Sequence, residues 1–478
     1  MANYLAKYAE PLVRSDFVPD TPIEATNTKR IDACRSGRFR WALVVPAFDE
    51  PADFLSKLTK QLHQHTGSQR ILIICVVNAP EDATVQQRER TLKMLPSPHD
   101  TKLQGLGNGI HTICIDAATQ ALPADRATGL ARKLGCDIVC RLINEGHITT
   151  PVLCNTDADA MLPVDYFERL SRAFATSPKA ACILPFKHSS PDAELQKAGT
   201  VYELYLRSLQ LNLQHCGSPY AYPALGSLLA INPEHYAKTR GFPKRRAGED
   251  FYLLNKLSKL GDIEYLTGAP VQLAARASPR VPFGTGPAIQ KILRNNDSTV
   301  YPPDLLDCPT YALASFALLR QFYDGITELT VDVQPGHDLP RLPREWRDPD
   351  LMWLLKRLGV PLALVRLRKN HRSNQGLIRA MHEWFDALKT IRFLNAARHF
   401  HQDESLFDQG AHLKRLLSQS LSRTQRGEFQ EPNAADALKL SPETLNQELE
   451  HCRSASRHSV ALAVSLSVER SEAHCLTD

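Results

Sequence analysis

Two aspartates one residue apart, Asp157 and Asp159, follow a short apolar run that begins at residue 148. The run has the length and composition of a buried strand, and Pro163 closes the loop behind it. Ligand sites of α/β proteins lie at the carboxyl ends of strands. Two carboxylates at such an edge can face one hard cation, and that cation can hold the phosphates of a nucleotide. We therefore expect a metal-assisted transfer reaction at Asp157 and Asp159, and a solvated acidic turn is the alternative for the pair taken alone.

A second acidic pair, Glu249 and Asp250, opens a stretch of helical spacing that we expect to run to about Leu260. Gly261 is the expected cap of this helix. Carboxylates in a first helical turn are stabilised by the helix dipole, so the pair also has a purely structural explanation. Its position alone does not decide between structure and chemistry.

Apolar strand-like runs alternate with segments of helical spacing over residues 41–260. The expected strands are residues 41–50, 71–77, 111–115, the run before Asp157, and 180–184. The expected helices are residues 53–65, a Gln- and Arg-rich segment after residue 82, and residues 129–144, 165–174 and 192–213. This alternation predicts an α/β fold, a mostly parallel sheet with helices on both faces. Residues 218–227, with two prolines and a glycine, are expected to form a loop or a short strand.

The remaining pattern gives the expected domain organisation. Beyond residue 293 the apolar spacing is helical almost throughout, in residues 311–323, 350–358, 376–393 and 403–421. Residues 1–40 are expected to form a polar extension packed on the main domain, with a short helix near residues 4–12. The other expected parts are an α/β domain at 41–295, an α-helical C-terminal region at 296–425 and a partly ordered tail at 426–478.

The composition is that of a globular protein, since 43% of the 478 residues are hydrophobic and 23% are charged. The formal net charge of +5 is mild for this length, which fits phosphorylated or anionic partners and gives no reason to expect nucleic acid. The 11 cysteines include no C-x-x-C pair, and several lie in apolar strand-like runs. We expect them to be small buried side chains in a reducing cytosol.

No segment has the ~20 apolar residues that a membrane-spanning helix needs, and the first residues lack the basic start and apolar core of a signal peptide. We expect a cytoplasmic protein, with peripheral contact at the inner face of the membrane left open. Between Lys356 and Lys414 basic residues outnumber acidic ones. They are either the solvated face of a helical bundle or a surface for anionic lipid or a polyanionic acceptor.

Taken in order, four segments resemble the family 2 glycosyltransferases, enzymes of the Rossmann-like GT-A fold that use nucleotide-sugar donors. The segments are residues 41–50 (WALVVPAFDE), 129–135 (GLARKLG), the D-x-D triplet 157–159, and 248–250 (GED). A narrower resemblance is to a bacterial subgroup of family 2-like proteins. It rests on Arg132–Lys133, residues 247–252 (AGEDFY) and residues 281–286 (VPFGTG). Together the matches cover about residues 41–286.

The resemblance implies an inverting, metal-dependent enzyme of the hexosyltransferase type. Asp159 would be the direct metal ligand, and Asp157 would support the metal or contact the ribose or the sugar of the donor. Asp250 would be the general base that takes the proton of the acceptor hydroxyl, and Glu249 would orient the acceptor. The metal would be Mg²⁺ or Mn²⁺, because both prefer oxygen ligands.

The resemblance also places substrate-binding residues at strand ends. These are Pro46, Phe48, Glu50 and Asn78. Asn78 stands where the family usually has an acidic residue that contacts the nucleotide base, so this chain departs from the pattern there. A UDP-sugar is the expected donor.

Three arginines are candidates for binding the diphosphate, because a planar guanidinium can grip two oxygens at once. They are Arg132, Arg276 and Arg280. Arg132 belongs to the segment 129–135 that resembles the family, whereas surface salt bridges are the alternative for Arg276 and Arg280. Gly284 and Gly286 flank Thr285 and suggest a loop that closes over the ligand, with a plain turn as the alternative.

Three other interpretations stay open. Phosphatases of the haloacid dehalogenase type also place Asp-x-Asp after a strand, but they have Thr or Val where this chain has Met161. A sugar nucleotidyltransferase shares the nucleotide-binding half of the architecture, and a scaffold could bind nucleotide without turnover. The acceptor, expected to be a glycan or a lipid-linked molecule, would be selected by residues 216–227 and by the helical C-terminal region.

Overall fold

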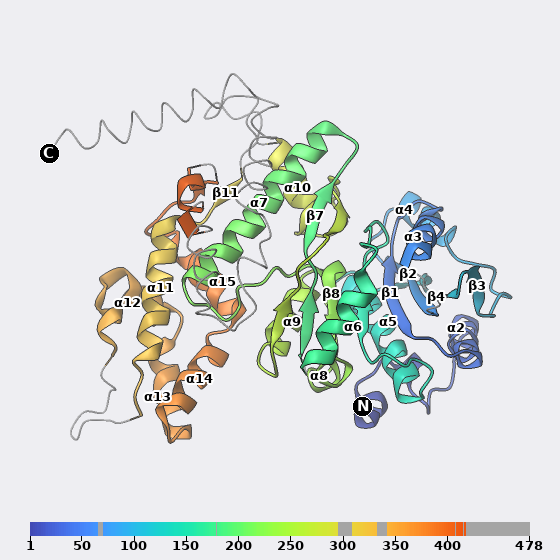
Figure 1. The fold of residues 1–478 in the computed structure, drawn as a ribbon, viewed down its shortest axis with the longest axis horizontal. Coiled ribbons are helices and arrows are strands. Elements are labelled where there is room, and N and C mark those ends of the chain that lie inside the picture. The colour runs from blue at the N-terminus through green and yellow to red at the C-terminus, as the bar shows by residue number, and fades with distance from the viewer. Residues whose placement is uncertain are drawn as a thin grey trace. The chain divides into compact units, whose positions relative to one another are not determined.

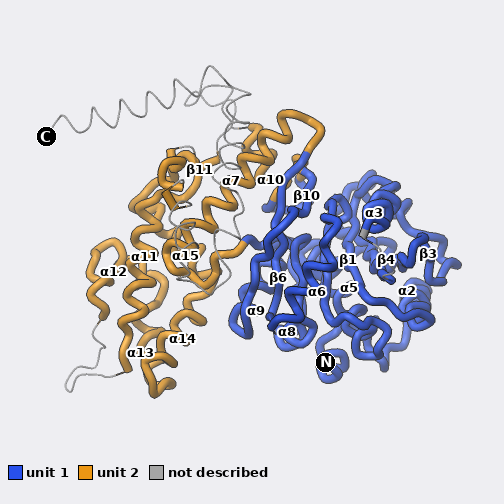
Figure 2. The backbone as a smooth tube through the Cα atoms, viewed as in Figure 1, with its two compact units in different colours: residues 1–189, 223–274, 279–284 blue, residues 190–222, 275–278, 285–478 orange. Residues whose placement is uncertain are grey.

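The computed structural model describes residues 1–65, 70–177, 179–294, 308–331, 342–406, 408–413 and 415–416. The chain divides into two compact units (Figure 2). Unit 1 comprises residues 1–189, 223–274 and 279–284, and unit 2 comprises residues 190–222, 275–278 and 285–478. Unit 1 contains the expected N-terminal extension and both acidic motifs. The domain boundaries expected at residues 40, 295 and 425 differ from this division and stay predictions.

Unit 1 is built on a sheet that contains eight strands within the described residues, in the order β3-β4-β2-β1-β5-β8-β6-β9 (Figure 1). The strands are β1 Trp41–Ala47, β2 Ile71–Pro80, β3 Gln104–Gly107, β4 Ile110–Leu122, β5 Leu153–Asn155, β6 Ala181–Ile183, β8 Leu229–Ile231 and β9 Ile263–Tyr265. Strand β1 is parallel to β2 and β5, β2 to β4, and β6 to β9, whereas β3, β5 and β6 each have an antiparallel partner. The predicted mostly parallel sheet is confirmed.

The central strands are buried over both faces, as their continuous apolar sequences predict. Side chains alternate between the faces of a strand, so Trp41 and Val44 of β1 point in opposite directions. The Trp41 ring lies 5.1 Å from the ring of Phe167 in helix α6 (Tyr166–Thr176). On the other face, Gly135 of helix α5 (Ala127–Asn144) packs so closely on Val44 that a methyl group there would overlap Val44 Cγ1. Helices therefore cover both faces, as predicted.

The other described helices of unit 1 surround this core. They are α1 Ala2–Lys7, α2 Pro22–Ala33, α3 Phe54–Leu62, α4 Val85–Leu92, α8 Pro233–Lys238 and α9 Glu249–Leu257. Two further strands, β7 Phe186–Ser189 and β10 Val271–Ala274, pair in parallel outside the main sheet. The nine described cysteines are free, and eight of them are buried, as predicted.

Three expectations about unit 1 are corrected. Strand β4 has 13 residues and not the five expected, because its polar end continues to pair beside β2. Helix α2 was not expected, although Thr21 and Glu24 form a capping box at its start. Helix α9 ends at Leu257, and Ser258 occupies the C-cap position that was expected for Gly261.

Unit 2 is mainly helical, as predicted for the C-terminal region. Its described elements are α7 Ala193–His215, α10 Thr285–Arg294, β11 Pro309–Thr310, α11 Leu313–Thr327, α12 Pro349–Arg357, α13 Val360–Asn370, α14 Asn374–Trp384, α15 Ala387–Ala397 and β12 Glu404–Ser405. Helices α7 and α10 pack together through an apolar cluster that includes Val201 and Ile289. A second cluster centres on buried Trp346, whose Nε1 donates to the Phe322 carbonyl at 3.0 Å.

Four expectations about this part of the chain are corrected or left open. The helix expected at residues 376–393 is two helices, α14 and α15, because the chain turns at Phe385 and Asp386. Thr285 and Gly286 are the first residues of α10, so the expected ligand-closing loop is wrong there. Of residues 403–421, the described ones form β12 and a short helical segment from residue 410. The tail at 426–478 lies outside the described residues.

No helix in the described part of the chain is long and apolar enough to cross a membrane. Some of the basic residues of unit 2 are paired with acids, for example Arg379 with Glu383 and Arg398 with Asp403. Peripheral membrane contact stays a prediction.

The close packing of α5 on the sheet can be tested with Gly135→Ala. In an open helix this change would stabilise the protein by about 1 kcal/mol, but here the new methyl overlaps Val44. We expect a net loss of about 1–2 kcal/mol, measured by urea unfolding. Gly105→Ala is the control, since nothing lies within 4 Å of a methyl group at that position. A wild-type midpoint for Gly135→Ala would contradict this packing.

Candidate active site

The expected site residues of unit 1 gather at one edge of the sheet. Strands β2, β1 and β5 are parallel neighbours, so their carboxyl ends meet at this edge. Phe48 follows β1, Asn78 lies near the end of β2, and Asp157 follows β5. Pro46 lies within β1 beside Val76 of β2, in the strand that leads to the edge.

Arg132 of helix α5 joins the two acidic motifs. Its Nη2 donates to Asp157 Oδ1 at 2.5 Å, and its Nε donates to Glu249 Oε1 at 2.9 Å. The Arg132 and Glu249 side chains are only 6% and 5% exposed, so this ion pair is shielded from water, whereas the Asp157 side of the other pair is open to solvent. The D-x-D triplet and the start of α9, separated by about ninety residues of sequence, therefore belong to one cluster.

The guanidinium fits because position 226 is a glycine. A methyl group on Gly226 would lie 2.7 Å from Arg132 Cζ. Gly226 begins a short 3-10 helix, Gly226–Leu228, just ahead of β8. Gly226 was expected only as part of a loop or short strand at residues 218–227, because a glycine near prolines is an ordinary turn signal.

Burial and charge together shift the acid–base properties of the cluster. Burial lowers the pKa of Arg132, but the charges of Asp157, Glu249 and Asp250 outweigh this effect and hold the pKa above its ordinary value. Burial raises the pKa of Glu249, although Arg132 opposes the shift. Burial and the neighbouring Glu249 carboxylate raise the pKa of Asp250 to about 7, again against the effect of Arg132. Asp250 can therefore exchange a proton near neutral pH.

The loop that carries the two aspartates is held in place by its own backbone. The Ala160 N–H donates to the Asp157 carbonyl at 3.2 Å, which closes a turn around Asp159. Met161 and Gln272 of β10 then exchange two backbone hydrogen bonds, at 2.8 and 2.9 Å. The Asp157 side chain is 40% exposed, so it can still reach a ligand.

The donor set at this loop fits a hard divalent cation. Mg²⁺ usually keeps several waters and binds through one or two carboxylates together with substrate phosphates. Asp157 and Asp159 could supply those carboxylates, although the described residues contain no cluster of three or more His, Cys, Asp or Glu that could hold a metal by itself. The charges point the same way, because one guanidinium faces the three carboxyl groups of Asp157, Glu249 and Asp250. A cation at this loop would reduce the repulsion between these carboxyl groups and a diphosphate.

Two other expected residues, Glu50 and Arg280, form an ion pair at the end of β1. Arg280 Nη1 lies 2.7 Å from Glu50 Oε1 and donates to the Phe48 carbonyl at 2.6 Å. The salt bridge named as the alternative for Arg280 is thus present, and it is largely buried. Asp49, between Phe48 and Glu50 in the chain, has a φ of 55° and forms an ion pair with Arg90. This pair fixes the turn that carries Phe48 and Glu50.

Three buried polar atoms at this edge have no hydrogen-bond partner among the described residues. They are Asn78 Oδ1, Thr156 Oγ1 and Arg132 Nη1. Buried polar atoms in folded proteins are nearly always paired, so these three atoms are candidate contacts for a polar ligand. Thr156 was missed in the sequence, because a threonine next to an acidic motif carries no signal of its own.

Arg276 belongs to unit 2, so its expected part in this site stays a prediction. The same holds for diphosphate binding by Arg132, whose described contacts are to carboxylates. Gly284 has a φ of 109°, a conformation that favours glycine, but Gly286 lies in α10.

No family model matches this chain, and no curated protein matches it either. Among solved structures, it is similar to S. aureus TarS 1–349 in complex with UDP-GlcNAc, with a TM-score of 0.31 and 9% identity over 72% of this chain and 91% of that one. A second structure of S. aureus TarS gives a TM-score of 0.29 with 10% identity over 75% of this chain and 55% of that one. A mycobacterial protein gives a TM-score of 0.26 with 14% identity over 55% of this chain and 72% of that one. Scores this low carry no inference about activity.

The raised pKa of Asp250 predicts a specific dependence of stability on pH. Between about pH 4 and 7 the unfolded chain has lost this proton while the folded chain keeps it, so the free energy of unfolding falls as pH rises through the window. Asp250→Asn cannot ionise and avoids this loss. We expect the variant to be more stable than wild type by up to about 4 kcal/mol at pH 8, and the gain to vanish below pH 4.

Thermal unfolding at a series of pH values measures this difference. Asp125→Asn is the matched control, because the Asp125 side chain is 74% exposed and its described ion pair is with the adjacent Arg126. A stability difference for Asp250→Asn that is constant from pH 4 to pH 8 would contradict the electrostatics of the cluster.

Proposed function

We propose that this chain is a glycosyltransferase of the GT-A type that moves a sugar from a nucleotide-diphosphate donor to an acceptor hydroxyl. The observation that carries the proposal is the position of Arg132, which donates to Asp157 of the D-x-D triplet and to Glu249 of the late acidic pair. A donor bound at the first motif would lie close to a base from the second, and such proximity accounts for much of enzymatic rate enhancement. Metal dependence, inversion, and the family 2-like hexosyltransferase type are parts of the same proposal.

On the donor side, the orphan atoms of Asn78 and Thr156 support a polar ligand at the ends of β2 and β5, such as the nucleoside of a UDP-sugar. Asp157 and Asp159 would hold the Mg²⁺ or Mn²⁺. When bound, that cation would neutralise charge on the departing diphosphate. The Glu50–Arg280 pair would border the nucleotide from the end of β1.

On the acceptor side, Asp250 would act as the general base. The acceptor oxygen forms a bond to the anomeric carbon as the bond from that carbon to the diphosphate oxygen breaks, and the acceptor proton passes to the Asp250 carboxylate. Because the acceptor and the diphosphate would lie on opposite faces of the sugar, the anomeric configuration would invert. A pKa of about 7 suits this task, since an efficient base has a proton affinity near the working pH.

Our proposals for the acceptor and for the location of the protein in the cell rest on the sequence alone. We propose a glycan or lipid-linked acceptor and a cytoplasmic protein with peripheral contact at the inner face of the membrane. The basic residues between Lys356 and Lys414 motivate this part of the proposal.

Donor binding is the first prediction of this function. UDP-, GDP-, CDP- and TDP-sugars, each with and without Mn²⁺, are tested by thermal shift on wild type and on Asp159→Ala. At about a hundred times its dissociation constant a ligand stabilises by about 2.7 kcal/mol, and we expect this shift for UDP-sugars with metal only. Asp159→Ala should lose the shift and keep its fold. No shift with any nucleotide would remove the basis of the transferase proposal.

Turnover is the second prediction. Asp250→Asn should lower the rate of UDP release from the bound UDP-sugar by about 10²–10⁴-fold, since the general base is lost, while the thermal shift with UDP and Mn²⁺ stays at the wild-type value. Asp125→Asn is again the control. Unchanged UDP release in Asp250→Asn would rule out Asp250 as the base. Synthesis of a nucleotide sugar from a nucleoside triphosphate would instead identify a sugar nucleotidyltransferase.

A further inference from the structure

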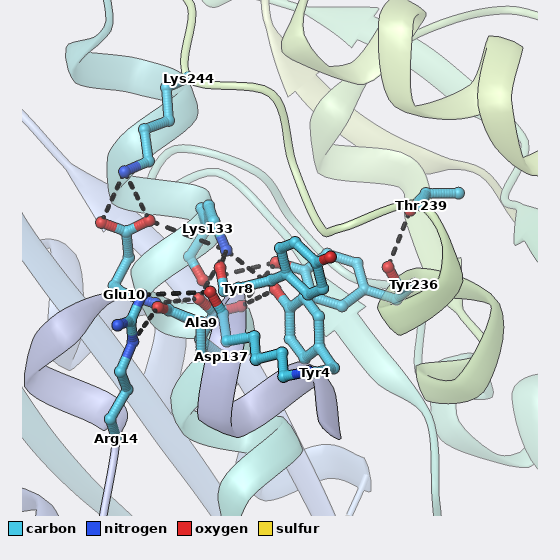
Figure 3. A network of polar contacts seen from close by, with 11 residues as sticks. Tyr4, Tyr8, Ala9, Glu10, Arg14, Lys133, Asp137, Tyr236, Thr239 and Lys244 are labelled. Atoms are coloured by element: carbon cyan, nitrogen blue, oxygen red, sulfur yellow. Dashed lines mark hydrogen bonds and ion pairs between the residues drawn. The ribbon is translucent and has the colours of Figure 1, made fainter. Parts of the chain in front are cut away.

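A buried polar network links the first residues of the chain to the segment that leads into the acidic pair. Figure 3 shows its members, which come from residues 4–14, from helix α5 and from residues 236–244. None of these residues has a part in the proposed chemistry. Two of its members, Lys133 and Asp137, nevertheless lie on the same helix as Arg132. Lys133 is the next residue after Arg132.

Asp137 of α5 is the centre of the network and is fully buried. It accepts hydrogen bonds from Tyr4 Oη at 2.5 Å, from the Glu10 N–H at 2.8 Å and from Tyr236 Oη at 3.1 Å. Lys133 Nζ lies 2.8 Å from Asp137 Oδ2 and also donates to Tyr4 Oη at 2.9 Å. A buried carboxylate with four donors is strongly held, because each donor satisfies a group that would otherwise be costly to bury.

The N-terminal segment also contacts the chain beyond Tyr236. Lys244 lies 2.9 Å from Glu10 Oε1. Gly241 has a φ of 75°, and a methyl group there would lie 2.5 Å from Tyr4 Oη. The Tyr4 hydroxyl therefore lies directly against the backbone at Gly241. Glu10 holds the same segment three residues later, at Lys244.

The far end of the same segment is held by α5. The Gly129 N–H donates to the Arg245 carbonyl at 2.9 Å, and a methyl group on Gly129 would overlap the Pro243 carbonyl. Gly248 then takes a φ of 72° and Glu249 begins α9, where it meets Arg132. Contacts at Gly241, Lys244 and Arg245 thus hold this segment a few residues before the acidic pair.

We propose that Tyr4 and Glu10, through Asp137, Lys133 and Lys244, form an N-terminal clamp that positions residues 239–248 and with them Asp250. Tyr4 and Glu10 are positioning residues, since their described contacts are not to the acidic pair. The significance for catalysis rests on the proposed function, but the positioning itself does not.

The clamp predicts that loosening it changes the surroundings of Asp250. The groups that act on this carboxyl are Glu249, Arg132 and Asp157, together with the burial provided by the start of α9. If residues 239–248 shift, water reaches Asp250 and its pKa moves back toward the ordinary range. The stabilisation that Asp250→Asn gives at pH 8 measures this effect without any nucleotide, so a failure of the transferase proposal does not affect the result.

The experiment compares Asp250→Asn in the wild-type, Tyr4→Phe and Asn27→Ala backgrounds by thermal unfolding at pH 5 and pH 8. Asn27 is the matched control, because it also belongs to the N-terminal extension, is 3% exposed like Tyr4, and bonds instead to the backbone of Asp116 in β4. We expect the extra stability at pH 8 to fall by about half or more in the Tyr4→Phe background and to persist in the Asn27→Ala background. Glu10→Gln, which loosens the contact with Lys244, should give a smaller fall in the same direction.

Hydrogen–deuterium exchange of backbone amides reports the positioning directly. In Tyr4→Phe, exchange over residues 239–254 should accelerate about tenfold while α2 keeps its wild-type rate, and Asn27→Ala should show the reverse. Wild-type exchange over residues 239–254 in Tyr4→Phe would overturn the clamp. Faster exchange with an unchanged pH 8 effect of Asp250→Asn would also overturn it, because the segment would then be anchored without positioning Asp250.

Discussion

One buried guanidinium holds the acidic groups of the site together. Arg132 lies between Asp157 and Glu249 with almost no access to water, and loss of its buried partner Glu249 would leave an uncompensated charge at a cost of about 3–5 kcal/mol. The surrounding chain is shaped by this requirement. Gly226 leaves space for the guanidinium, and Gly129 and Gly135 let α5 approach its neighbours closely enough to deliver it.

The same cluster explains why its carboxylates suit a transfer reaction. Burial of Asp250 and the charge of the neighbouring Glu249 raise the pKa of this carboxyl to about 7, because the single arginine offsets them only in part. A structural ion-pair network would normally balance its charges. The excess of acid at a sheet edge, beside unpaired atoms of Asn78 and Thr156, is the feature on which the proposed metal and phosphorylated ligand rest.

The sequence predicted the α/β fold and most strands of unit 1, because Val- and Ile-rich runs such as residues 71–77 are long and separated by clear turns. It did not predict where helices break: the turn at Phe385 and Asp386 lacks glycine and proline. Thr285 and Gly286 were mistaken for a loop, because a glycine pair is a local turn signal and the start of α10 depends on tertiary packing.

The sequence named the residues of the Arg132 cluster as candidates, but it did not predict the contacts between them. Asp157, Glu249 and Arg132 each belong to a recognisable motif, whereas the contacts between them join positions 25 and 117 residues apart. Such contacts depend on the order of strands in the sheet, which local spacing does not encode. The same is true of Tyr4 and Asp137, whose hydrogen bond spans 133 residues of sequence.

The central claim is that the D-x-D triplet and the late acidic pair form one metal- and nucleotide-binding site. Crystals grown with UDP and Mn²⁺ test it most directly, since the anomalous signal of manganese locates the metal without reference to the protein. We expect one strong peak between the carboxylates of Asp157 or Asp159 and the diphosphate, with the base of UDP beside Asn78. A manganese peak or a UDP molecule bound elsewhere on the chain, with this edge of the sheet empty, would contradict it.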